Sequence, residues 1–204
     1  MLSRSFVAGI NNNIRIAIFA SGAGSNAQKI IEYFRKEPHI KIDLVVCNKP
    51  GAGVIKIAGD NNIECLMVNR EFPLGSDLFI AALKKRRIDF IILAGFLIKI
   101  PSALIMAFPK KIINIHPALL PAYGGKGMYG MFVHEAVIAN KENKSGISIH
   151  YVDELYDHGE IIFQATYDIL PADTAETLAQ TIHRLEHTHY PPVIEKIVKK
   201  QKTS

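Results

Sequence analysis

Apolar residues along the chain fall into short continuous runs that alternate with stretches of helical spacing. The first run is Arg15–Ala20, and the glycine-containing stretch Ser21–Asn26 follows it directly. Beyond that stretch, apolar side chains recur three or four positions apart at Ala27, Ile30 and Phe34. Continuous apolar runs are typical of strands buried on both faces, and the second spacing is that of an amphipathic helix. The pattern therefore predicts a strand, a glycine loop and a helix at the start of the fold.

The same alternation continues to the C-terminus and sets the fold class. Further strands are predicted at Ile42–Cys47, Glu64–Val68, Asp89–Leu93, Ile112–Ile115, Gly146–Val152 and Ile161–Ile169. Helices are predicted at Val54–Asn61, from Ser76 through Arg87, at Pro101–Phe108, at Val133–Asn140, and along the face marked by Leu178, Ile182 and Leu185. Strands alternating with helices predict an α/β fold with a doubly wound, mostly parallel sheet, and the last two strands predict an antiparallel part at the C-terminal end.

Three local signals qualify the C-terminal elements. Gly146–Val152 alternates apolar and polar residues, which predicts a strand with one solvated face. Asp173 and Glu176 have the spacing of a helix capping box. Pro191-Pro192 is expected to interrupt the last helix and leave a separate short helix at Val193–Lys200, because proline supplies no backbone donor.

Length and composition predict one folded unit. The chain has 204 residues, of which 49% are hydrophobic and 21% charged, enough apolar material for a sizeable core. We expect a loose leader at 1–13, a single domain at 14–200 and a short tail at 201–204. Two cysteines without a CxxC motif favour the reducing cytoplasm, and no stretch has the length of a membrane-spanning helix or the pattern of a signal peptide.

The chain is moderately basic, with a formal net charge of +5. Much of the excess lies in two runs, 84–87 and 196–202, which are typical of a solvated helix face and a terminal tail. No aromatic-interleaved groove accompanies them, so we expect no nucleic-acid partner. A positive field instead favours a phosphorylated or carboxylate-bearing small molecule.

Candidate chemistry centres on the segment Ile112–Pro121. Asn114 and His116 lie two residues apart at the end of a predicted buried strand, so their side chains point the same way. Ligands of open α/β sheets bind beyond the carboxyl ends of strands, where an amide and an imidazole together suit an oxyanion site. The alternative is structural: Asn114 caps a turn and His116 is a hydrogen-bonded core histidine.

Three other stretches admit two interpretations each. Ser21–Asn26 has the position of a phosphate cradle at a helix N-terminus, although a tight turn needs the same glycines and the dinucleotide fingerprint is not met. The acidic turn Asp153–Gly159 either holds a carboxylate against His116 or is merely solvated. His183 and His187 have the spacing of helical metal ligands, but no third ligand is evident, so we expect no metal.

Taken together, these segments resemble the folate-dependent formyltransferase family over most of the chain, from about Arg15 to Lys200. The segments that carry the resemblance, in the family's order, are Ser21–Asn26, Leu93–Phe96, Asn114–Pro117 with Leu119–Pro121, Asp157–Gly159, and Glu186 followed by Tyr190-Pro191. The glycine loop and the late glutamate most closely match the branch that acts on 5′-phosphoribosylglycinamide in purine synthesis.

The resemblance implies a role for each matching segment. Residues expected to bind the phosphorylated substrate are Gly24, Ser25, Asn26, Ala27 and Gln28 in the phosphate loop and Glu186 at the amine-bearing glycinamide portion. Residues expected to bind the folate are Leu97, Ile98, Lys99, Ile100, Asn114, Asp153, Glu154 and Leu155. Residues matching the catalytic trio are Asn114, His116 and Asp157.

The implied reaction is the attack of the substrate amine on the formyl carbon of the co-substrate 10-formyltetrahydrofolate. The Asn114 amide and a protonated His116 are expected to donate to the tetrahedral oxyanion. Asp157 is expected to raise the proton affinity of the imidazole and to help pass the amine proton to the leaving nitrogen. Because the formyl group is already activated, the resemblance implies that no metal is needed. The oligomeric state stays open between monomer and homodimer.

The chain departs from the family pattern at three places. Gly124–Gly130 is glycine-rich where the family often has a histidine-bearing stretch, and His158 adds an ionisable group beside Asp157. No arginine securely matches the one that reaches the folate glutamate tail, near Pro73–Ser76 in this chain.

The sequence leaves two kinds of alternative function open. The family's formyltetrahydrofolate hydrolase has an additional N-terminal domain and its methionyl-tRNA enzyme a C-terminal RNA-binding domain. We expect neither, from the 13 residues before the first strand and the end of the chain near the last helix. A non-catalytic nucleotide-binding module is the alternative from another class, in which the trio is structural.

Overall fold

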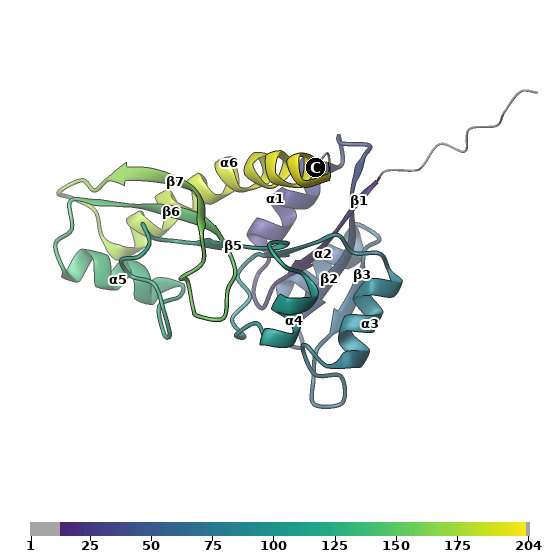
Figure 1. Ribbon diagram of the computed structural model, residues 1–204. Coiled ribbons are helices and arrows are strands. Elements are labelled where there is room, and N and C mark those ends of the chain that lie inside the picture. The colour runs from purple at the N-terminus through teal and green to yellow at the C-terminus, as the bar shows by residue number, and fades with distance from the viewer. Residues whose placement is uncertain (1–12, 203–204) are drawn as a thin grey trace, which may run out of the picture.

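The computed structural model describes residues 13–202, and its centre is a single mixed sheet of seven strands (Figure 1). The strands are β1 (Ile14–Phe19), β2 (Ile40–Cys47), β3 (Glu64–Met67), β4 (Phe90–Leu93), β5 (Ile112–His116), β6 (Lys144–Tyr151) and β7 (Ile161–Asp168). Their order is β3-β2-β1-β4-β5-β6-β7. The first five strands run parallel, and β6 and β7 are antiparallel to their neighbours. The predicted fold class is confirmed.

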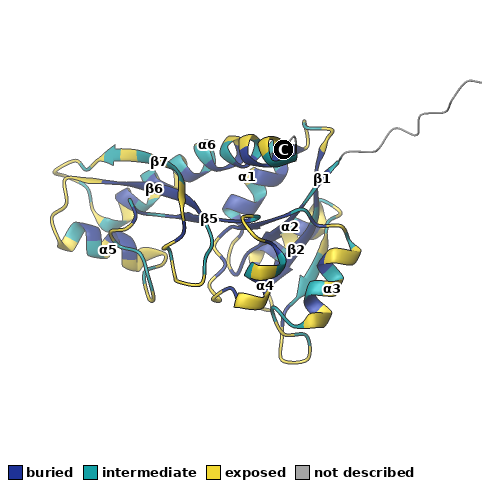
Figure 2. Ribbon diagram, viewed as in Figure 1, coloured by how far each residue is buried: buried dark blue, intermediate teal, exposed yellow. Residues whose placement is uncertain are grey.

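Six helices cover the two faces of the sheet. They are α1 (Ser25–Phe34), α2 (Gly53–Asp60), α3 (Asp77–Lys85), α4 (Ser102–Ala107), α5 (Met131–Ala139) and α6 (Ala175–Lys202). Buried side chains of α1, α2, α5 and α6 form one core with the sheet, and those of α3 and α4 form a second core on the opposite face. Figure 2 shows burial concentrated in the central strands and on the inward helix faces. No helix within this described range is both long and apolar enough to cross a membrane.

The strand order places a crevice beside β1. Strand β1 pairs with β2 on one side and with β4 on the other, so the loops that follow β1 and β4 diverge from a common edge. Such a switch point is where open α/β sheets bind ligands. Ser21 joins the two loops, because its backbone N–H donates to the Gly95 carbonyl at 3.0 Å and its hydroxyl accepts from the Leu97 N–H at 3.0 Å.

Strand β6 corrects the prediction of a half-solvated strand. Its residues from Ser145 to His150 are all buried, polar ones included. The segment after β5 covers the face that was expected to be solvated. Ser148 Oγ donates to the Ala118 carbonyl at 2.7 Å and accepts from the Leu120 N–H at 2.9 Å. At Ser148 and His150, alternating polarity therefore marks buried polar side chains that have partners, and not exposure.

Helix α6 corrects two further predictions. It is continuous through Pro191 and Pro192, where an interruption was expected. Tyr190 explains why: its fully buried hydroxyl lies 2.9 Å from the Leu93 carbonyl and 3.1 Å from that of Ile113, which fixes the helix against β4 and β5. Packing of this kind outweighs the loss of two helical hydrogen bonds.

The start of α6 also differs from the capping box predicted at Asp173. Thr174 Oγ1 accepts from the Thr177 N–H at 3.3 Å, so Thr174 caps the helix. Asp173 instead accepts from the Leu170 N–H and the Tyr167 hydroxyl and closes the loop before it. At its far end α6 includes Lys202, two residues into the predicted tail. The predicted leader lies outside the described residues except for residue 13.

Candidate active site

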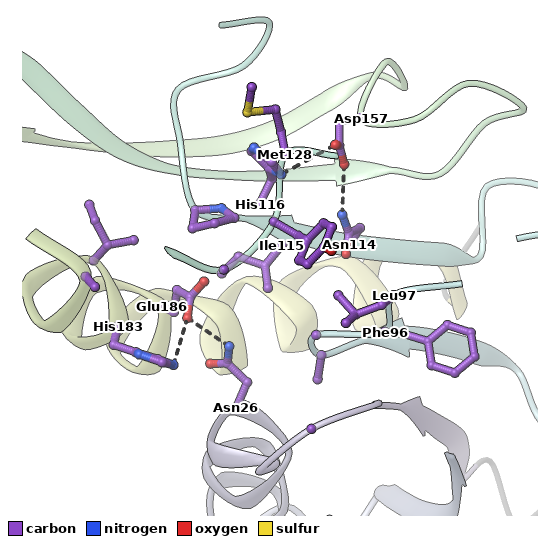
Figure 3. A pocket seen from close by; sticks show the side chains of 18 of the residues that line it. Asn26, Phe96, Leu97, Asn114, Ile115, His116, Met128, Asp157, His183 and Glu186 are labelled. Carbon is purple, nitrogen blue, oxygen red and sulfur yellow. Dashed lines mark hydrogen bonds and ion pairs between the residues drawn. The ribbon is translucent and has the colours of Figure 1, made fainter. Parts of the chain in front are cut away.

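A cavity of about 550 Å³ opens at the carboxyl ends of β1, β4 and β5. Its walls are the loop before α1, the strand ends, one face of α6 and most of the glycine-rich segment Gly124–Gly130. In Figure 3, Asn114, His116 and Asp157 lie together on one side, and Asn26, His183 and Glu186 lie together on the other. The structure thus brings the predicted trio and the predicted phosphate loop into one cavity.

Asn114 is positioned by the strand that pairs with its own. It lies directly opposite His150 in the register of β5 and β6. His150 Nδ1 donates to the Tyr151 carbonyl at 2.9 Å, which leaves Nε2 to accept from Asn114 Nδ2 at 3.0 Å. A second, longer contact of 3.4 Å joins Asn114 Nδ2 to Asp157 Oδ1. The amide is therefore oriented by a buried histidine that sequence reasoning assigned to a solvated face.

His116 is nearly buried between a carbonyl and a carboxylate. Its Nε2 donates to the Tyr123 carbonyl at 2.7 Å, and its Nδ1 lies 3.5 Å from Asp157 Oδ2. Burial lowers the pKa of His116 below its usual value, although Asp157 acts in the opposite direction. The lowered pKa favours the neutral ring, in which the proton lies on Nε2 and Nδ1 faces Asp157.

Asp157 connects the acidic turn to the rest of the site. Its backbone has φ 54°, a conformation that Asp and Asn tolerate better than most residues. Oδ2 accepts from the Gly125 N–H at 3.0 Å. Burial alone raises the pKa of this carboxyl, but His150, His116 and the Gly125 donor outweigh it, and the pKa lies below its usual value. The interpretation of the acidic turn as merely solvated does not hold for Asp157.

The loop before α1 has the geometry of a compact backbone cradle. Gly24 caps α1 with φ 85°, and a Cβ there would lie 2.9 Å from Val54, so the position requires glycine. Gly24, Ser25 and Asn26 line the cavity. Ala27 is buried in the core and Gln28 donates to Glu32 at 2.7 Å, so neither of these two predicted residues faces the cavity.

Glu186 lies beside this loop. Its Oε2 accepts from Asn26 Nδ2 at 2.9 Å and lies 3.6 Å from His183 Nε2, which also contacts the Ser25 hydroxyl at 3.2 Å. Burial raises the pKa of Glu186, although the hydrogen bond from Asn26 and the nearby His183 act in the opposite direction. The ring centres of His183 and His187 lie 5.4 Å apart with the ring planes tilted by 45°, and no group of metal-ligating side chains occurs among residues 13–202.

The predicted folate-binding residues divide between two cavities. Leu97 lines the large one. A smaller cavity of about 70 Å³ adjoins it and is lined in part by Ile98, Lys99, Ile100, Asn114, Asp153, Leu155 and Asp157. Glu154 lines neither cavity. Exposed apolar side chains surround this region, among them Leu97 and Leu155, and Lys99 Nζ lies 5.7 Å from the centre of the Tyr156 ring.

His158 does not extend the trio, although it follows Asp157 in sequence. It is exposed and its Nδ1 lies 3.1 Å from Asp153 Oδ2. The sequence analysis did not identify four residues of the site, which are His150, Tyr123, Lys126 and His134. The register opposite Asn114 could have indicated His150. Nothing local in the sequence indicates the carbonyl of Tyr123.

Comparison with known proteins identifies the family. The family model described as Formyl transferase matches residues 14–194. Phosphoribosylglycinamide formyltransferase of Bacillus subtilis is 38% identical over 189 residues, which are 90% of this chain and 94% of that protein. The chloroplastic protein of that name from Vigna unguiculata is 43% identical over 190 residues.

The alignment with the Vigna protein covers 89% of this chain and 60% of the plant protein, so the chain spans about three fifths of that relative's length. Among solved structures, phosphoribosylglycinamide formyltransferase from Bacillus halodurans matches with a TM-score of 0.82 at 35% identity. That match covers 92% of this chain and 96% of the other. With nearly all of its described residues matched, this chain belongs to the formyl transferase family.

Proposed function

We propose that this protein transfers the formyl group of 10-formyltetrahydrofolate to the amine of 5′-phosphoribosylglycinamide, a step of purine biosynthesis. The proposal is supported chiefly by one observation: Asn114, His116 and Asp157 line the same cavity as the backbone cradle before α1. The likeness to the Bacillus subtilis relative, which aligns over almost its whole length, supports the same substrates.

Different parts of the cavity suit the two substrates. Backbone N–H groups at the N-terminus of α1 favour the phosphate, because they lack helical partners and carry partial positive charge. Glu186 and Asn26 next to them offer an acceptor and a donor for the body of the ribonucleotide. The exposed apolar residues around Leu97 and Leu155 suit the flat ring system of the folate.

Residues of the cavity can stabilise the negative charge that develops on the formyl oxygen and can move the amine proton. As the amine nitrogen bonds to the formyl carbon, charge builds on the formyl oxygen. Asn114 Nδ2 can donate to that oxygen in place of its long 3.4 Å contact with Asp157. Neutral His116 can accept the amine proton at Nδ1, where Asp157 stabilises the imidazolium, and return it to the folate nitrogen as the carbon–nitrogen bond breaks.

We extend the proposal to partners and location. The two small molecules are the expected ligands, with no metal, nucleic acid or membrane involved, and the protein acts in the cytoplasm as a monomer or homodimer. Both cysteines in the described range, Cys47 and Cys65, are free thiols, which agrees with a reducing compartment.

The test compares formyl transfer by the wild type and by Asp157→Asn. Asparagine tolerates the positive φ at this position, so the variant removes the charge without straining the turn. We expect kcat to fall by roughly two to four orders of magnitude, the usual contribution of a positioned acid–base group. Absorbance of the released tetrahydrofolate product measures the rate.

Asp168→Asn is the matched control, because Asp168 is an exposed residue at the end of β7 and its substitution should leave kcat unchanged. Consumption of the folate without the ribonucleotide would indicate a hydrolase. Binding of ligands without turnover by the wild type would indicate the non-catalytic module.

A further inference from the structure

The glycine-rich segment Gly124–Gly130 brings a lysine to the cavity. Within residues 13–202, Lys126 is the one lysine or arginine that lines the large cavity. The same walls carry two carboxyl groups, those of Asp157 and Glu186. A ligand with a phosphate dianion therefore meets a cavity whose side chains supply a single permanent positive charge.

The backbone cradle cannot supply that charge by itself. Its residues Gly24, Ser25 and Asn26 carry no cationic side chain, and a helix N-terminus offers only partial charge. His183 is the nearest alternative, but its Nε2 is already shared between the Ser25 hydroxyl and Glu186. Lys99 lines the smaller cavity instead.

The segment is held so that the lysine stays at the site. The Gly125 N–H donates to Asp157 at 3.0 Å, and the Met128 N–H closes a turn onto the Gly125 carbonyl at 3.1 Å, so Lys126 lies inside an anchored turn. Gly125 and Gly127 have φ of 97° and 91°, a backbone conformation that residues with a side chain rarely adopt. The backbone conformation thus serves to present one side chain, because a glycine precedes and follows it.

We propose that Lys126 is the countercharge for the phosphate of the ribonucleotide, in the cavity that it lines together with the cradle at Gly24–Asn26. The proposal rests on the proposed function and adds a specificity-determining residue to it. A lysine ammonium on a long stem can reach a phosphate as a point charge, and a contact of this kind discriminates the phosphorylated substrate from its dephosphorylated form.

The test measures binding without turnover, by titration calorimetry in the absence of folate. The ligands are 5′-phosphoribosylglycinamide and the corresponding ribonucleoside, which lacks the phosphate. For Lys126→Met we expect the Kd of the ribonucleotide to rise by roughly tenfold or more, the scale of a lost charged contact, while the Kd of the ribonucleoside stays as in the wild type. Lys126→Arg should recover most of the affinity.

Lys144→Met is the control, because Lys144 is an exposed lysine of β6 outside both cavities. Equal weakening of the binding of both ligands would show that Lys126 does not act on the phosphate and would overturn the proposal. Unchanged ribonucleotide binding by Lys126→Met would overturn it as well. If the wild type fails to bind the ribonucleotide at all, the proposed function fails first and this proposal with it.

Discussion

The two sides of the cavity are built in different ways. The strand wall carries Asn114 and His116 on β5, which is paired with a strand on each side. The loop wall consists of the segment Gly124–Gly130 and the acidic turn Asp153–Gly159, which Asp157 joins through the Gly125 N–H. The strand wall is thus fixed by the fold itself, whereas the loop wall depends on a few contacts. Changes to the loop wall should therefore affect activity more than stability.

Among substitutions that leave every side chain of the catalytic trio in place, the largest effect is expected from Gly159→Ala. A Cβ at this buried glycine would lie 1.9 Å from the Tyr151 carbonyl oxygen, so the turn must move. Asp157 is two residues away and would shift from His116, and a displacement of about 1 Å costs roughly 100-fold in rate. We expect kcat to fall by about that factor with a modest loss of Tm. A kcat equal to the wild type would contradict the comparison of the two walls.

Gly59→Ala in α2 is the control for this substitution. Nothing lies within 4 Å of a Cβ there, so alanine should stabilise the helix slightly and leave kcat unchanged.

An intermediate effect, on stability, is expected from His134 in α5, directly after the loop wall. Burial, with His183 and His116 adding to it, lowers the pKa of His134 to about 4. In the unfolded chain the His134 imidazole has a pKa near 6.5, so it becomes protonated at a higher pH than in the folded protein. The stability that the neutral imidazole contributes is therefore present above pH 6.5 and is lost as pH falls toward 4. Between pH 7 and pH 5 the loss is about 2 kcal/mol.

His134→Phe removes this titration while keeping a ring of similar size. We expect urea unfolding to show that the free energy of unfolding decreases less between pH 7 and pH 5 in the variant than in the wild type, by about 2 kcal/mol. The same decrease in both proteins would refute the assignment to His134.

The smallest effect is expected at the exposed end of the folate region. Lys99→Met removes a cation beside Tyr156 and should raise the KM for 10-formyltetrahydrofolate by roughly threefold, since exposed charged contacts contribute little. The increase should vanish at 1 M salt, where screening is nearly complete. Lys84→Met in α3 is the control, and a salt-independent increase would mean that Lys99 acts by packing.

Sequence and structure agree where one local pattern determines the result. Apolar runs predicted the strands, and the spacing of Asn114 and His116 at a strand end predicted the strand wall. The burial of Ser148 depends on a covering segment 30 residues earlier, and the continuity of α6 depends on the contact of Tyr190 with two strands. The role of Lys126 follows from the charges around it. None of these long-range contacts leaves a periodic signal in the sequence.

The hydrogen bond between Asp157 and the Gly125 backbone bears on how this chain can be recombined with its relatives. One carboxylate serves both His116 and the glycine-rich segment. A chimera that exchanges residues 124–130 alone would keep the carboxylate and replace the loop that it holds, and an exchange of 153–159 alone would do the reverse. The two stretches, about 30 residues apart in the chain, should therefore be exchanged together.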